Sequence, residues 1–97
     1  MTVVALVTDL LDRSKFPDGT RFVRKLDGVE ADVVVVDLSV AGAVDGIAAL
    51  RAAGSGARVV AYGRHTNADV LRDAREAGAD RVLARSAFFG DVAGALS

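Results

Sequence analysis

The feature of the sequence that most constrains the fold is the run ADVVVVDLS at residues 31–39. A run that is apolar on both of its alternating faces is typical of a strand buried on both sides, as in a parallel sheet. Asp37 follows the four valines directly. In open α/β folds the carboxyl ends of the strands form the edge at which ligands bind. Asp37 is therefore the first candidate for a functional residue.

The rest of the chain alternates between strand-like and helix-like segments. Further strands are predicted at residues 2–7, 20–24, 57–62 and 80–84. Helical patterns with apolar residues on one side cover 43–53 and 67–77, and a glycine follows each of them. Strands that alternate with helices predict right-handed crossovers and a parallel sheet.

Three segments of the chain are too short for full helices. Residues 8–19 leave room for a short helix at about Leu10–Phe16, and a last helix fits only at Asp91–Leu96. Residues 25–31 connect two strands and are too few for a helical crossover. We therefore expect one helix to be missing and the first and last to be shortened.

Composition indicates a single small globular domain over residues 1–97, with 52% hydrophobic and 26% charged residues. The net charge of −1 gives no strong field to attract nucleic acid or an anionic membrane. The chain has no cysteine and one histidine, His65, which we expect in an exposed loop. The first residues lack a basic leader, and arginine and alanine are abundant. We expect a cytoplasmic, bacterial protein.

The order of elements resembles that of a response-regulator receiver domain. The resemblance is clearest in ADVVVVDLS and in AREAGADRVLARSAFF, residues 74–89. It implies a flavodoxin-like α/β fold with a five-stranded parallel sheet in the order 2-1-3-4-5. In such domains an aspartate accepts a phosphoryl group beside a Mg²⁺ ion that acidic residues hold.

Carried onto this sequence, the resemblance makes Asp37 the candidate phospho-acceptor and Asp9 and Asp37 the candidate metal ligands. Thr8 stands where receivers have a second acid, and Gly63 where they have a hydroxyl. Arg85 replaces their lysine, and its planar head group is not equivalent. Asp12 could supply the missing carboxylate, although it lies a turn into the first helix. Val82 stands at the position in the fifth strand where receivers usually carry an aromatic residue.

These departures leave alternatives open. Asp37 is a solvated acid paired with Arg85, a phospho-acceptor, or a contact for another ligand or partner. We expect a degenerate receiver, a pseudo-receiver, that regulates by protein–protein interaction, is not phosphorylated and catalyses nothing. The alternatives are a true receiver phosphorylated on Asp37 with Mg²⁺, and an enzyme or small-ligand binder that uses the edge formed by Asp37, Gly63 and Arg85. Otherwise we expect no cofactor, and no nucleic-acid or membrane partner.

The shortened helices also predict how the chain associates. A parallel sheet needs cover on both faces, and we expect the first and last helices to be too short to complete one of them. A large exposed apolar patch seldom stays uncovered. We therefore expect a homodimer or an obligate protein partner on this face, with the contact formed by Leu11, Phe16, Phe88, Phe89 and Leu96.

Overall fold

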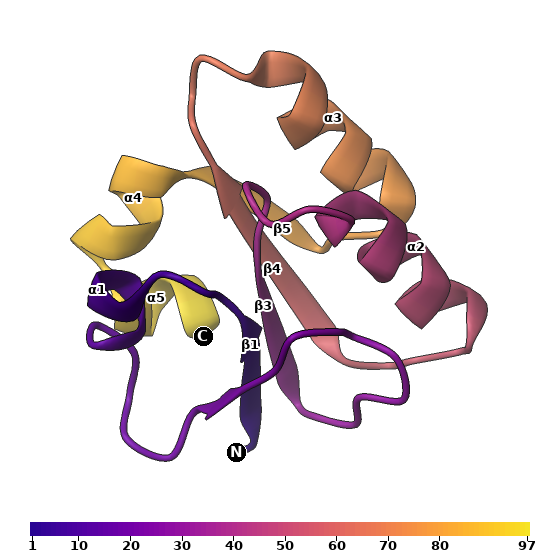
Figure 1. The fold of residues 1–97 in the computed structure, drawn as a ribbon, viewed down its shortest axis with the longest axis horizontal. Coiled ribbons are helices and arrows are strands. Elements are labelled where there is room, and N and C mark those ends of the chain that lie inside the picture. Colours follow the sequence, from indigo (N-terminus) through magenta and orange to yellow (C-terminus); the bar gives the residue numbers. More distant parts are fainter.

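A five-stranded parallel sheet separates two groups of helices (Figure 1). The computed structural model describes all residues from Met1 to Ser97. The strands are β1 (Val3–Leu6), β2 (Arg21–Phe22), β3 (Val33–Asp37), β4 (Arg58–Gly63) and β5 (Arg81–Ala84). The helices are α1 (Leu10–Arg13), α2 (Ala43–Ala52), α3 (Ala68–Ala77), α4 (Arg85–Gly90) and α5 (Val92–Leu96). The strand order β2-β1-β3-β4-β5 confirms the predicted fold class.

The centre of the sheet is fully buried, as the valine run predicts. Val34, Val35 and Val36 are inaccessible to solvent, and β3 pairs with β1 on one side and β4 on the other. The register places Asp37 beside Tyr62 at the carboxyl ends of these strands. The run therefore forms the central strand, and its terminal carboxylate faces the edge where polar residues gather.

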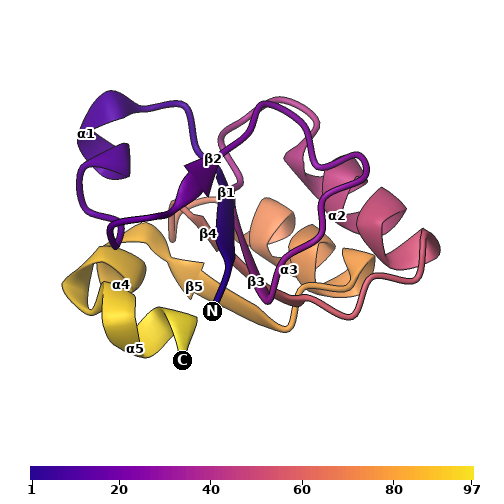
Figure 2. The same cartoon turned by 90° about the horizontal axis from the view of Figure 1, so that it is seen from below.

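Helices α2 and α3 cover one face of the sheet (Figure 2). Ile47, Leu50 and Ala74 are their buried contacts with the strands. Asn67 caps α3 by accepting a hydrogen bond from the Val70 amide at 3.3 Å. No helix lies between β2 and β3. Residues 23–32 cross this face without regular structure, as their number predicted, and only Leu26 is buried among them.

The opposite face is covered by α1, α4 and α5 (Figure 2). The sequence predicted one helix here after β5, at Asp91–Leu96, and missed α4, which begins directly where β5 ends. Asp91 separates α4 from α5 and caps α5 by accepting a hydrogen bond from the Gly94 amide at 3.0 Å. The additional helix adds cover that the sequence analysis did not count.

Aromatic side chains complete this second layer. Phe88 is inaccessible to solvent and stacks on Tyr62 with ring centroids 4.6 Å apart. Phe16 packs against Phe22 at 5.6 Å and against Phe88 at 5.7 Å. Large rings fill the volume that short helices leave open. The expectation of an uncovered face was therefore wrong.

The proposed dimer contact must be corrected for the same reason. Phe16, Phe88 and Leu96 are buried within the chain itself, with exposed fractions of 8%, 0% and 3%. They cannot meet a second chain in this fold. Leu11 remains 75% exposed, and Phe89 is partly exposed. The homodimer itself stays a prediction.

The amino-terminal edge of the sheet is held by Arg51 of α2. Its guanidinium donates to the carbonyls of Gly78 at 2.8 Å, Ser55 at 3.0 Å and Ala57 at 2.8 Å. It also donates to the carboxylate of Asp80 at 2.6 Å. The same carboxylate oxygen accepts the Val59 amide at 2.7 Å. The AGAD segment thus joins α2, β4 and β5 away from the carboxyl ends of the strands.

Candidate functional site

A polar cleft of about 430 Å³ lies at the carboxyl ends of the strands. Its lining consists of Thr8, Asp9, Asp12, Asp37, Ser39, Tyr62, Gly63, Arg64 and Arg85. The structure therefore brings together all the edge residues that the sequence singled out. The reason is topological, because the segments that follow parallel strands leave the sheet at a common edge.

Asp37 is buried in this cleft, with an exposed fraction of 4%. One carboxylate oxygen, Oδ1, accepts hydrogen bonds from the amide of Ser39 at 2.9 Å and from its hydroxyl at 2.8 Å. The other, Oδ2, accepts none from the chain. The alternative of a solvated acid is therefore wrong, because the turn after β3 folds back over the carboxylate.

Arg85 pairs with Asp12, and not with Asp37 as in the first of the three alternatives for Asp37. One terminal nitrogen donates to Oδ2 of Asp12 at 2.7 Å, and the other donates to Oδ1. The paired fork of an arginine and a carboxylate is among the stronger protein ion pairs. Its geometry requires a carboxylate presented edge-on, and α1 presents that of Asp12, which is 1% exposed. The first residue of α4 is thereby fixed to α1.

The ion pair controls the protonation of its members. The hydrogen bond from Arg85 lowers the pKa of Asp12, although burial of the carboxyl opposes the shift. The same hydrogen bond raises the pKa of Arg85 above its ordinary value. The guanidinium carbon also lies 4.9 Å from the ring centre of Phe89, a favourable cation–π arrangement. Both partners are charged over the whole physiological range.

Asp9 is occupied by a structural role. It is the N-cap of α1, and its Oδ1 accepts the amide of Asp12 at 3.0 Å. This contact satisfies a donor that the first turn of a helix leaves free. The side chain is held at the start of α1 and lines the cleft from there.

The acids of the cleft do not fit the Mg²⁺ site that the fold implies. Asp9 caps a helix, Asp12 is held by both nitrogens of Arg85, and Asp37 has one oxygen held by Ser39. No three aspartate, glutamate or histidine side chains lie close enough to surround a metal ion. Mg²⁺ demands near-ideal octahedral oxygen geometry, which this arrangement does not offer.

Tyr62 is one of the cleft residues that the sequence analysis did not single out, together with Ser39 and Arg64. It is inaccessible to solvent, and its hydroxyl has no hydrogen-bond partner. Burial, followed by the negative charges of Asp37 and Asp12, raises its pKa well above the ordinary range. The neutral phenol is therefore the stable form. The residue was counted only as part of an apolar strand, although its position opposite the end of β3 could have indicated it.

Gly63 is close-packed, so its lack of a hydroxyl is also a lack of space. A Cβ atom here would lie 3.3 Å from Leu71 and 3.4 Å from Leu38. Contacts this short require the neighbouring leucines to move. Thr8 is exposed at the mouth of the cleft, and His65 lies outside it on an exposed loop. At the position where receivers carry a hydroxyl side chain, the side chains of Leu38 and Leu71 therefore occupy the space.

Comparisons with known proteins identify the fold that carries this cleft. No family model and no curated protein matches the sequence. A response regulator from Thermotoga maritima superposes with a TM-score of 0.67 at 15% identity, over 98% of this chain and 96% of its own. A response regulator from Burkholderia pseudomallei, solved with a phosphorylated aspartic acid, calcium ion and citrate, gives 0.69 at 18% identity. That match covers all of this chain and 67% of the other.

A third structure, RcsB from Salmonella enterica serovar Typhimurium bound to promoter rprA, gives a TM-score of 0.71 at 14% identity. The match covers 99% of this chain and 66% of RcsB. The chain therefore has the receiver fold of response regulators along nearly its whole length. The resemblance noted in the sequence is confirmed at the level of the fold.

Proposed function

We propose that this chain is a pseudo-receiver, a signalling or regulatory module that acts by binding another protein and is not phosphorylated. The receiver fold supports a signalling role. The way in which the charged residues of the cleft are paired supports the absence of phosphorylation. The module catalyses no reaction of its own and acts in the cytoplasm, with a protein partner or a second copy as its target.

The observation that carries this proposal is the ion pair between Arg85 and Asp12. Phosphoryl transfer to an aspartate requires positive charge at the acceptor, because negative charge on the phosphoryl oxygens must be neutralised. Arg85, the cation that follows β5, is held by Asp12 on α1 and forms no ion pair with Asp37. Thr8 adds no second carboxylate for a metal ion. Asp37 therefore has neither a directly paired cation nor the second acid that would help to hold a metal ion.

One observation favours the alternative, a true receiver phosphorylated on Asp37. Its Oδ2 is free of hydrogen bonds from the chain and borders the polar cleft. The Burkholderia structure shows a phosphorylated aspartic acid in the same fold. Under this alternative a bound Mg²⁺ would have to draw Asp9 away from the start of α1.

The two are separated by mass spectrometry of the intact chain after incubation with acetyl phosphate and Mg²⁺. We expect no stoichiometric phosphoryl adduct. The double variant Thr8→Asp/Arg85→Lys restores an acid and a compact cation, so it should gain an adduct that Asp37→Asn removes. A Mg²⁺-dependent adduct on the unmodified chain, lost in Asp37→Asn, would establish the alternative and end the proposal.

The third function, small-ligand binding in the cleft, rests on the unpartnered hydroxyl of Tyr62. A thermal-shift screen with nucleotides and small metabolites tests it, with Tyr62→Phe as the control. Under our proposal none of these compounds raises the melting temperature in a manner that depends on Tyr62.

No helix of the chain has the length and apolarity needed to cross a bilayer.

A further inference from the structure

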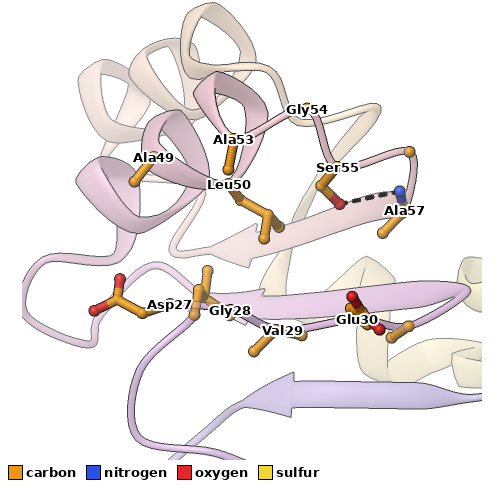
Figure 3. Close-up of a pocket in the computed structure, with 13 residues that line it drawn as sticks. Asp27, Gly28, Val29, Glu30, Ala49, Leu50, Ala53, Gly54, Ser55 and Ala57 are labelled. Atoms are coloured by element: carbon orange, nitrogen blue, oxygen red, sulfur yellow. Dashed lines mark hydrogen bonds between the residues drawn. The ribbon is translucent and has the colours of Figure 1, made fainter.

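A second hollow lies on the α2 side of the sheet, apart from the polar cleft. It has a volume of about 580 Å³ and runs between residues 26–31 and the second half of α2 (Figure 3). Leu50, which is nearly buried, points toward it from α2, and Val29 lies on the opposite wall (Figure 3). The loop with Ser55 closes one end, where the Ser55 hydroxyl accepts the Ala57 amide at 3.2 Å.

The hollow exists because the crossover from β2 to β3 has no helix. A helix in this crossover would have packed its side chains beside α2. Residues 26–31 instead run past α2 as a loop without regular structure. The wall residues are also small. Ala49 on α2, Ala53 at the C-cap of this helix and Gly28 on the loop leave the volume unfilled.

The charge of the hollow is of one sign. Asp27 and Glu30 are its only charged lining residues, and both are exposed. Neither makes an ion pair or a side-chain hydrogen bond with the chain. The carboxyl end of α2 already has its own cation, because Arg51 donates to the carbonyls of Ser55 and Ala57 there. An apolar floor is thus bordered by two carboxylates that have no partner within the chain.

A neighbouring hollow extends this one along α2. The two share Leu26, Asp27 and Ala49, and the neighbour continues to Gly42 at the start of the helix. The combined groove therefore follows the ten residues of α2, a length of about 15 Å. Its far end is lined by charges of both signs, from Arg24, Lys25 and Asp45. The groove matches a partner helix of about three turns, and its acidic end matches basic side chains on that helix.

We infer that this groove binds an amphipathic helix of a partner protein, with apolar side chains over Leu50 and basic side chains at Asp27 and Glu30. The inference rests on the proposed function, since it names the surface by which the module binds its partner. Helix-in-groove recognition requires an apolar groove and charges that set orientation and specificity. Both are present here, on a face that does not include Asp37.

Two stapled helical peptides of about 15 residues serve as the probe. Both carry the same leucine and alanine stripe. One has lysines flanking half of the stripe, the other has glutamates at the same positions, and all remaining positions are glutamine. Titration into the ¹⁵N-labelled chain should shift the amide signals of residues 26–31 and 49–57. The lysine peptide should bind about tenfold more tightly, as expected for two partly exposed ion pairs.

Variants of the chain sharpen the test. Asp27→Lys/Glu30→Lys should invert the preference between the peptides, whereas Asp18→Lys/Glu76→Lys, with the same change in charge at exposed acids outside the groove, should preserve it. Ala53→Leu fills the groove and should weaken binding about tenfold. Ala52→Leu on the same helix lies outside the lining and should not.

Equal affinity for the two peptides, shifts centred elsewhere, or no binding would each overturn the inference. Thermal melts that match the unmodified chain show that each variant is folded. The phosphorylation experiment reports on Asp37 alone. A failure of the groove therefore leaves the pseudo-receiver proposal standing, and a phosphorylated Asp37 leaves the groove result unchanged.

Discussion

Arg85 donates from both terminal nitrogens to the carboxylate of Asp12, although the two residues are 73 positions apart in the sequence. The pair connects the end of β5 to the helix that follows β1. Its carboxylate is buried, while the guanidinium side chain is 42% exposed. The partly exposed arginine thus neutralises a charge that could not be buried alone.

A double-mutant cycle should show this asymmetry. Arg85→Met leaves the buried Asp12 without a partner and should lower the free energy of unfolding by about 2–3 kcal/mol. The double variant Asp12→Leu/Arg85→Met removes both charges and should recover most of that loss. Urea unfolding of the two single variants and the double variant measures the coupling. A cycle with no coupling would mean that the pair does not form in solution.

The same pair predicts an acid-sensitive part of the stability. The lowered pKa of Asp12 means that the unfolded chain, with a pKa near 3.8, binds a proton more readily than the folded chain. Its contribution is therefore present above about pH 4 and is lost as the pH falls through the folded pKa. Asp12→Asn should flatten the fall in unfolding free energy between pH 5 and pH 3. The exposed-acid variant Glu76→Gln, tested by urea unfolding, should keep the unmodified slope.

Asp37 should be replaceable by asparagine but not by alanine. The asparagine carbonyl can still accept the amide and hydroxyl of Ser39, so Asp37→Asn should change stability by less than about 1 kcal/mol. Asp37→Ala removes both bonds and should cost about 1–3 kcal/mol. Chemical denaturation followed by circular dichroism compares them. An equally large loss in both variants would show that the negative charge itself holds the fold.

Gly78 should be intolerant of a side chain because its φ of 117° is unfavourable for other residues and its space is occupied. A Cβ atom would lie 2.5 Å from Cγ of Arg51, which the AGAD network holds in place. We expect Gly78→Ala to lower the free energy of unfolding by about 1–3 kcal/mol. The melting temperature should fall with it. Gly90→Ala is the matched control, since nothing lies within 4 Å of its added methyl. Equal melting temperatures would contradict the constraint.

The association state can be tested without the buried phenylalanines. Phe88→Asp should unfold the chain, because the ring is inaccessible and its replacement places a charge in the core. Leu11→Asp alters an exposed side chain and should leave the fold intact. If the chain dimerises through α1, Leu11→Asp should produce a monomer by light scattering. A monomer before any substitution would remove the dimer prediction.

Local pattern was sufficient for the sheet and for two helices. Four valines with no polar side could lie only in a central strand, and the periodicity of residues 43–53 and 67–77 matches α2 and α3 closely. The absence of a helix between β2 and β3 followed from chain length alone. These features depend on side-chain period and on the reach of the backbone, both of which are properties of neighbouring residues.

The sequence by itself therefore determined the parallel sheet and the gathering of polar residues at one edge, and its resemblance to receiver domains implied the strand order. Only the tertiary structure decided which of them pair. Whether Arg85 meets Asp12 or Asp37 depends on how the short helices α1 and α4 sit on the sheet. The closure of the second face was decided in the same way, because Phe16, Phe88 and Tyr62 meet only once distant segments pack together. Packing of this kind sums contacts between remote positions, which no local pattern contains.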